Sequence, residues 1–225
     1  MTEAGWLAGK NPGRMLWSLP RDASERKMRL FSLACCRRVA DLLRDEWSSV
    51  ALEVAEMYLE GQKTVKCLEA GYTAINRVFR RRGHPVGSPE RFAAHAASCA
   101  TCPRAPPHRY DAYFAAHTAD HAAAARGRPL PGGRRSASGR ERQAQAQLLR
   151  CVFGSPFRPA SIQPAWLTPT VAHLAAVAYE ERAMPSGELD AQCLQVFADD
   201  LEEAGCSDAD LLKHCRGPGP HVRGC

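Results

Sequence analysis

Cysteine and histidine, two residue types that bind transition metals, gather in two parts of the sequence. The first set is His95, Cys99, Cys102 and His108, with the spacing H-x3-C-x2-C-x5-H. A C-x2-C pair is typical of a zinc knuckle, and the i,i+4 spacing of His95 and Cys99 places both on one face of a helix. This set is the best local metal pattern in the chain and our first candidate for a zinc site.

The second set lies in the stretch HCRGPGPHVRGC and consists of His214, Cys215, His221 and Cys225. Up to four ligands lie within reach there, but the adjacent residues His214 and Cys215 are poorly placed to share one tetrahedral ion. We therefore interpret the stretch as a helix that ends at Gly217 and a rigid turn, with metal binding as the alternative. The vicinal pair Cys35–Cys36 is a weaker candidate still, because neighbouring helical positions diverge by about 100°.

Catalytic patterns are missing from the sequence. It holds no Gly-rich phosphate loop, no HExxH and no GxSxG, and no cysteine is matched with a base as a nucleophile would be. The acidic pairs Asp199–Asp200 and Glu202–Glu203 lie off the apolar stripe of their predicted helix and are interpreted as a solvated face. The catalytic residues are thus unknown, and the sequence favours a protein that is not an enzyme.

Charge is unevenly distributed along the chain, whose net charge is +6. Arginines concentrate between Arg77 and Arg142, whereas acidic residues concentrate in the C-terminal quarter. The arginines Arg80 to Arg82 end a predicted helix, where cations are expected from the helix dipole alone. Since the sequence has no zinc-finger spacing and no helix-turn-helix signal, we expect no sequence-specific nucleic-acid binding.

Composition indicates a globular protein in a reducing compartment. Of the 225 residues, 45% are hydrophobic and 24% are charged. The first ten residues do not follow the pattern of a signal peptide, and no stretch approaches the ~18 apolar residues of a membrane span. The ten cysteines fall below the level of a disulfide scaffold, so we expect free thiols in a cytoplasmic protein with no membrane partner.

Residues 1–83 predict an N-terminal unit of three amphipathic helices. In the first helix, capped at Asp22 or Ser24, apolar residues recur three and four positions apart. The predicted buried stripes are Met28, Phe31, Cys35, Val39 and Leu42 in the first helix, Trp47, Val50, Ala51, Val54 and Tyr58 in the second, and Val65, Leu68, Tyr72, Ile75 and Phe79 in the third.

Residues 84–142 form an atypical segment rich in alanine, arginine, proline and histidine. Parts of it can be helical, but alanine buries little area per residue, so we expect this segment to add little core. Its Pro/Gly/Arg/Ser run, residues 127–140, is typical of a linker or of disorder.

Residues 143–225 predict a C-terminal helical unit, which we expect to form one domain with the first unit. Helical segments end at Gly154 and Gly205, and Thr168–Pro169 is a strong helix start. The helix before Gly205 is predicted to bury Leu189, Cys193, Val196, Phe197, Leu201 and Ala204. No strand alternation occurs, so the sequence predicts an all-α fold, an irregular helical bundle.

Several blocks of the sequence, above all LACCRR and HCRGPGPHVRGC, resemble a much-duplicated family of planctomycete proteins. The resemblance covers both ends of the chain, and it implies no activity and no site residues. Members of that family continue past HVRGC with a short apolar segment, and their middles are regular Ala-rich helices. These differences suggest the hypothesis of a truncated or partly mis-framed copy.

The sequence thus predicts a helical scaffold or protein-interaction module without a cofactor, its protein partner unknown. The first alternative is a zinc-dependent binding module that uses one of the Cys/His sets. The second alternative is an enzyme of unidentifiable class.

Overall fold

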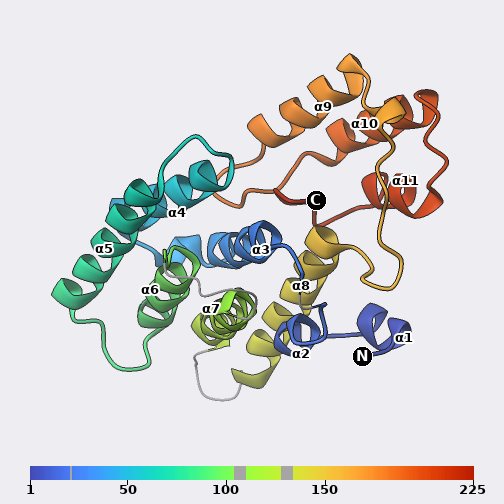
Figure 1. Cartoon of the computed structure of the whole chain (residues 1–225). Coiled ribbons are helices and arrows are strands. Elements are labelled where there is room, and N and C mark those ends of the chain that lie inside the picture. Colours follow the sequence, from blue (N-terminus) through green and yellow to red (C-terminus); the bar gives the residue numbers. More distant parts are fainter. Residues whose placement is uncertain (21, 104–109, 128–133) are drawn as a thin grey trace. The chain divides into compact units, whose positions relative to one another are not determined.

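The computed structural model describes residues 1–20, 22–103, 110–127 and 134–225, and these residues fold as α-helices with no β-sheet among them (Figure 1). The predicted all-α class is therefore confirmed. The α-helices are α1 (Glu3–Leu7), α2 (Pro12–Leu16), α3 (Glu25–Arg37), α4 (Glu46–Leu59), α5 (Val65–Arg82), α6 (Pro89–Ala100), α7 (Tyr110–Gly127), α8 (Arg134–Phe153), α9 (Pro169–Glu180), α10 (Ala191–Glu203) and α11 (Ala209–Cys215), with short 3-10 helices at Ala40–Leu42 and Pro164–Trp166.

The chain divides into two compact units, Met1–Ala146 and Gln147–Cys225. The long helix α8 therefore contributes its last turns to the second unit. The boundaries predicted after residues 83 and 142, and the expected packing of the two ends of the chain, stay predictions.

Helix α3 supplies much of the core of the first unit. Ser24 caps it by accepting a hydrogen bond from the backbone N–H of Lys27 at 3.4 Å. The predicted stripe is buried at Met28, Phe31, Cys35 and Val39. Cys36 is buried as well, so the thiols of the vicinal pair are enclosed in the core, and burial raises the pKa of both.

Helix α4 buries a different face from the one that its large apolar residues predict. Trp47 and Val50 are exposed, and the buried positions are Ser48, Ala51, Leu52, Ala55 and Glu56. Small residues let α4 approach α5 closely, since a Cβ built on Gly71 would lie 3.3 Å from the Cβ of Ala51. The predicted stripe of α4 was therefore correct at Ala51 and wrong at Trp47 and Val50, because close backbone packing and a buried carboxylate decide which face turns inward.

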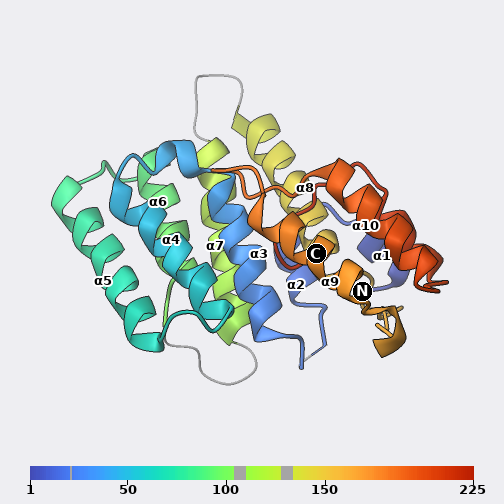
Figure 2. The same cartoon turned by 90° about the horizontal axis from the view of Figure 1, so that it is seen from above.

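Alanine builds the packing of α6 and α7, which lie side by side in Figures 1 and 2. The fully enclosed alanines of the two helices are Ala93, Ala96, Ala97, Ala115, Ala119, Ala122 and Ala123. Small side chains allow helix axes to approach closely, so many short contacts replace a few large ones. This part of residues 84–142 does contribute to the core, contrary to our expectation. The predicted linker, residues 127–140, is contradicted at residues 134–140, which form the start of α8, because the helix extends further toward the N-terminus than the apolar pattern indicates. Residues 128–133 of that linker lie outside the described residues.

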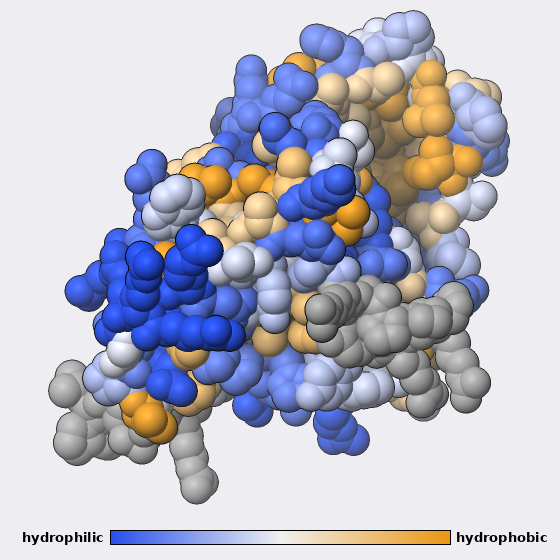
Figure 3. Space-filling model, turned by 60° about the vertical axis from the view of Figure 1, so that its left-hand side comes forward, coloured by the Kyte–Doolittle hydropathy of each residue, from blue (hydrophilic) through white to orange (hydrophobic). Residues whose placement is uncertain are grey.

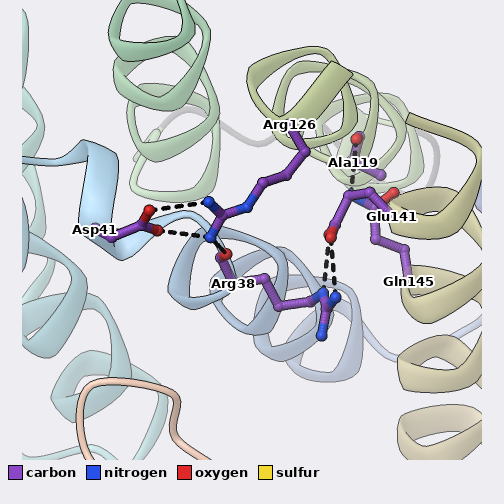
Figure 4. Close-up of polar contacts among 6 residues, drawn as sticks. All are labelled: Arg38, Asp41, Ala119, Arg126, Glu141 and Gln145. Atoms are coloured by element: carbon purple, nitrogen blue, oxygen red, sulfur yellow. Dashed lines mark hydrogen bonds and ion pairs between the residues drawn. The ribbon is translucent and has the colours of Figure 1, made fainter. Parts of the chain in front are cut away.

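Ion pairs join α3, α7 and the first part of α8 (Figure 4). The guanidinium of Arg38 donates to both carboxylate oxygens of Glu141, at 2.8 and 2.9 Å, and Glu141 also accepts from Gln145. Gln145 donates in turn to the backbone carbonyl of Ala119. Arg126 binds the carboxylate of Asp41 and the carbonyl of Arg38, which fixes the end of α7 to the segment after α3.

The second unit has its own small core where α9, α10 and α11 meet. Buried residues that pack there are Trp166, Val171, Ala198, Leu201, Cys206, Leu212 and Cys215. On α10 the inward positions are Leu194, Ala198 and Leu201, whereas Val196 is 51% exposed. The predicted stripe of this helix was thus correct at Leu201 and wrong at Val196.

A test of these local assignments is the N-cap of α4. The carboxylate of Asp45 accepts from the backbone N–H of Ser48 at 2.8 Å and from its hydroxyl at 2.8 Å. Asp45→Ala should lower the free energy of unfolding by about 1–2 kcal/mol, because the cap of a helix start is lost. Urea denaturation followed by circular dichroism measures the effect. Glu46→Ala, a neighbouring change that removes no cap, is the matched control and should change stability much less.

Among the described residues, no helix has both the length and the apolar composition of a membrane span.

Candidate metal centre

Four potential metal ligands come together in the second unit: Cys151, His214, His221 and Cys225. Cys151 lies in the last turn of α8, His214 lies in the last turn of α11, and the other two lie in the segment that follows the Gly-Pro-Gly-Pro turn. Figure 1 shows the C-terminal residue beside the end of α8. Within the described ranges, this is the one group of at least three His, Cys, Asp or Glu side chains so gathered.

The ligand atoms of the group are close enough to share one ion. All four lie within 4.8 Å of one another. Nε2 of His214 is 2.9 Å from Sγ of Cys225, and Nδ1 of His221 is 3.6 Å from the same sulfur. A tetrahedral zinc ion with bonds of about 2.0–2.3 Å separates its ligand atoms by about 3.3–3.8 Å. The donor set fits zinc after small side-chain adjustments.

A backbone carbonyl fixes the orientation of His221. Its Nε2 lies 3.0 Å from the carbonyl oxygen of Gly217, to which it can only donate, and this leaves Nδ1 as the lone-pair nitrogen facing the sulfurs. Metal-binding histidines commonly donate their second ring nitrogen to a carbonyl or carboxylate in this way. The hydrogen bond therefore sets the tautomer that a metal at Nδ1 requires.

The turn before His221 requires glycine. Gly219 has φ +85°, and a Cβ added there would lie 2.8 Å from the backbone nitrogen of His221. Any larger residue would therefore be strained and would push against the ligand. The GPGP stretch thus places the ring of His221 against that of His214. The two rings pack edge to face, with 4.9 Å between their centroids.

The segment after the turn is held in place from two sides. The backbone N–H of Leu189 donates to the carbonyl of His221, and the N–H of Gly224 donates to the hydroxyl of Tyr179. The hydroxyl of Tyr179 donates to the carbonyl of Cys225 at 3.3 Å. These contacts position His221 and Cys225 from α9 and from the segment before α10.

The electrostatics of the group favour a thiolate. Hydrogen bonds to its sulfur, above all from Cys225, hold the pKa of the Cys151 thiol well below its usual range, although burial acts in the opposite direction. A hydrogen bond between the imidazole of His221 and the sulfur of Cys151 raises the pKa of His221. Since the thiolate is the form of cysteine that binds metals, the surroundings of Cys151 prepare it as a ligand.

Sequence reasoning found three of the four residues in this group. His214, His221 and Cys225 belong to the second predicted set, but Cys215 does not join them. It follows His214 in α11 and therefore points about 100° away around the helix, into the apolar core beside Trp166 and Leu201. Burial there raises the pKa of the Cys215 thiol to about 11.

Cys151 takes the place of Cys215 and was missed. It is far from the other three in the sequence, so no spacing pattern includes it. Nothing in the sequence around Cys151 marks it as a ligand, because its position beside the other three residues depends on the fold.

The residues of the first predicted set are placed elsewhere. The ring of His95 packs against Phe79 at 4.6 Å and His121 at 5.1 Å between centroids, and burial lowers the pKa of His95. Burial also raises the pKa of the Cys99 thiol to about 11. Cys102 is buried beside it, and its carbonyl accepts from Arg29. His108 lies outside the described residues, so a metal site at this set stays a prediction.

The chain matches no protein-family model, no curated protein and no solved structure. The chemistry of the site therefore carries the functional argument.

Proposed function

We propose that the second unit, Gln147–Cys225, is a zinc-binding module in which Cys151, His214, His221 and Cys225 hold one structural zinc ion. The observation that carries the proposal is the approach of four Cys and His ligand atoms to within 4.8 Å of one another from three separate segments. Tetrahedral sites with two sulfur and two nitrogen ligands are typical of zinc. The proposal adopts the zinc-dependent alternative over the interpretation without a cofactor.

The role of the zinc is structural in this proposal. Four protein ligands fill a tetrahedral site, whereas catalytic zinc sites keep one position for water or substrate. The ion would join the end of α8, the end of α11 and the last segment of the chain. A cytoplasmic location is part of the proposal, because a reducing compartment keeps both thiols available as ligands.

A protein partner is the second part of the proposal. The second unit exposes large apolar side chains at Ile162, Leu167 and Val196, and the first does so at Trp17 and Trp47. On the face shown in Figure 3, orange residues form several groups among blue ones. Such groups support a helical protein-interaction module, as the sequence suggested. Membership of the planctomycete family that the sequence resembles also remains a proposal.

Metal analysis of the purified chain tests the proposal. We expect one zinc ion per chain, and replacement by Co²⁺ should give the visible absorption of a tetrahedral site with thiolate ligands. Cys151→Ser and His221→Asn should each weaken zinc binding strongly, because each removes a ligand. Zinc content that stays at zero after refolding with zinc would refute the proposal.

Two changes in the same unit serve as matched controls. Cys193→Ser and His173→Asn replace a cysteine and a histidine that lie outside the group. Both variants should keep one zinc ion per chain and the same cobalt spectrum. Equal loss in the controls and in the ligand variants would show that the metal binds elsewhere.

A further inference from the structure

A cavity of about 400 Å³ opens beside the candidate metal centre, entirely within the second unit. Its walls come from one face of the end of α8, one face of α11 and the turn that follows α11. The lining residues are Gln147, Arg150 and Cys151, then Asp210, Lys213 and His214, then Gly217 to His221. The volume lies within the range of small-molecule sites.

Positively charged side chains outnumber negatively charged ones in the lining of the cavity. Arg150 and Lys213 contribute two positive charges, and Asp210 contributes one negative charge. The carboxylate of Asp210 also lies 3.0 Å from the guanidinium of Arg158, a further cation close to this acid. The walls therefore retain a net positive charge.

The metal ligands Cys151, His214 and His221 also line the cavity. Two thiolates and two neutral imidazoles around a divalent zinc ion have no net charge. The zinc-loaded centre would therefore not repel an anion that lies beside Arg150 and Lys213. This step rests on the proposed zinc site.

Apolar surface completes the cavity. Pro218 and Pro220 lie in its lining, and the aliphatic stems of Arg150 and Lys213 can add to it. The space exceeds what a bare inorganic anion fills, so the ligand needs an organic body as well as a charged head.

We propose that this cavity of the zinc-loaded protein binds a small organic oxyanion, a carboxylate or a phosphate monoester, with its head group between Arg150 and Lys213 and its body against the Gly-Pro-Gly-Pro turn. Guanidinium and ammonium groups donate charge-assisted hydrogen bonds to either head group. A guanidinium can bind two oxygens at once, so Arg150 would set the orientation of the ligand.

Calorimetric titration with three probes of similar shape tests the proposal: phenyl phosphate, benzoate and the neutral benzamide. We expect one of the anions to bind the zinc-loaded protein, and benzamide to bind at least about tenfold more weakly. The tighter of the two anions identifies the head group. Equal binding of all three probes, or no heat with either anion, would overturn the proposal.

Charge variants locate the binding. Arg150→Gln and Lys213→Gln should each weaken anion binding by about tenfold or more, with zinc content unchanged. Arg216→Gln is the matched control, because Arg216 lies on the same turn of the chain but outside the cavity and pairs with Asp199 and Glu202. Anion binding that is lost equally in the control, or retained in both cavity variants, contradicts the proposed site.

Zinc measured on the same samples separates the two proposals. Protein without zinc after refolding with zinc would refute the metal centre. Protein with one zinc ion per chain that binds neither anion would refute the oxyanion cavity and leave the metal centre in place.

Discussion

Removal of zinc by a chelator should unfold residues 160–225, while residues 1–126 keep their helices. The second unit has only small apolar clusters, such as the one around Trp166 and Leu212. Its last segment is held by hydrogen bonds to Tyr179 and by the buried side chain of Val222. Structural zinc contributes about 10–16 kcal/mol in zinc-finger peptides, comparable to the whole stability of a domain. Loss of the ion therefore removes more than these clusters can offset.

Hydrogen exchange measured by mass spectrometry gives the result for each segment. After chelation we expect amides of α9, α10 and α11 to exchange quickly and those of α3, α4 and α5 to stay protected. Addition of zinc should restore protection. Cys151→Ser should exchange like the chelated protein without any chelator, whereas His173→Asn should behave as the unmodified chain. Full protection of residues 160–225 after proven zinc loss would contradict a structural role.

The sequence was most informative where one helix face is apolar and the cap is unambiguous. In α3, Ser24 marks the start, and Met28, Phe31 and Cys35 recur at helical spacing, so both the element and its buried face were predictable. Helix α9 is similar, since Thr168 accepts from the N–H of Val171 and Pro169 follows at the first position.

Helix α4 shows why apolar spacing alone can assign the wrong face. Trp47 and Val50 have larger apolar side chains than Ala51 and Ala55. The two alanines nevertheless face inward, because α5 approaches closely at Gly71. The approach of two helices depends on the partner, which a single helix does not reveal. Alanines of α6 and α7 were undervalued for the same reason.

Three of the four residues of the candidate metal centre were predicted from the sequence. The pair His221 and Cys225 could be found because both lie in a short stretch beside His214. Cys151 could not, because its position beside them depends on how α8 and α11 meet in the second unit. The identity of a ligand set drawn from distant segments is a property of the tertiary structure.

A buried ion pair between α3 and α4 is expected to have the largest effect on the stability of the first unit. Nε of Arg37 lies 2.7 Å from Oε1 of Glu56, and the two side chains are only 7% and 5% exposed. Glu56→Ala should lower the free energy of unfolding by about 3–5 kcal/mol, because it leaves a buried guanidinium without its carboxylate. That loss is a large part of the ~5–15 kcal/mol that stabilises a domain.

The same two helices provide the control. Arg26 of α3 and Glu60 after α4 form an ion pair at 2.6 Å, but their side chains are 42% and 23% exposed. Glu60→Ala should therefore cost at most about 1 kcal/mol, since water solvates the cation that remains. The double change Arg37→Met and Glu56→Leu should recover most of the loss, because no unpaired charge stays buried. Urea denaturation followed by circular dichroism measures all four proteins. If Glu56→Ala costs no more than Glu60→Ala, burial does not govern the strength of these pairs, and the inward position of Glu56 on α4 is incorrect.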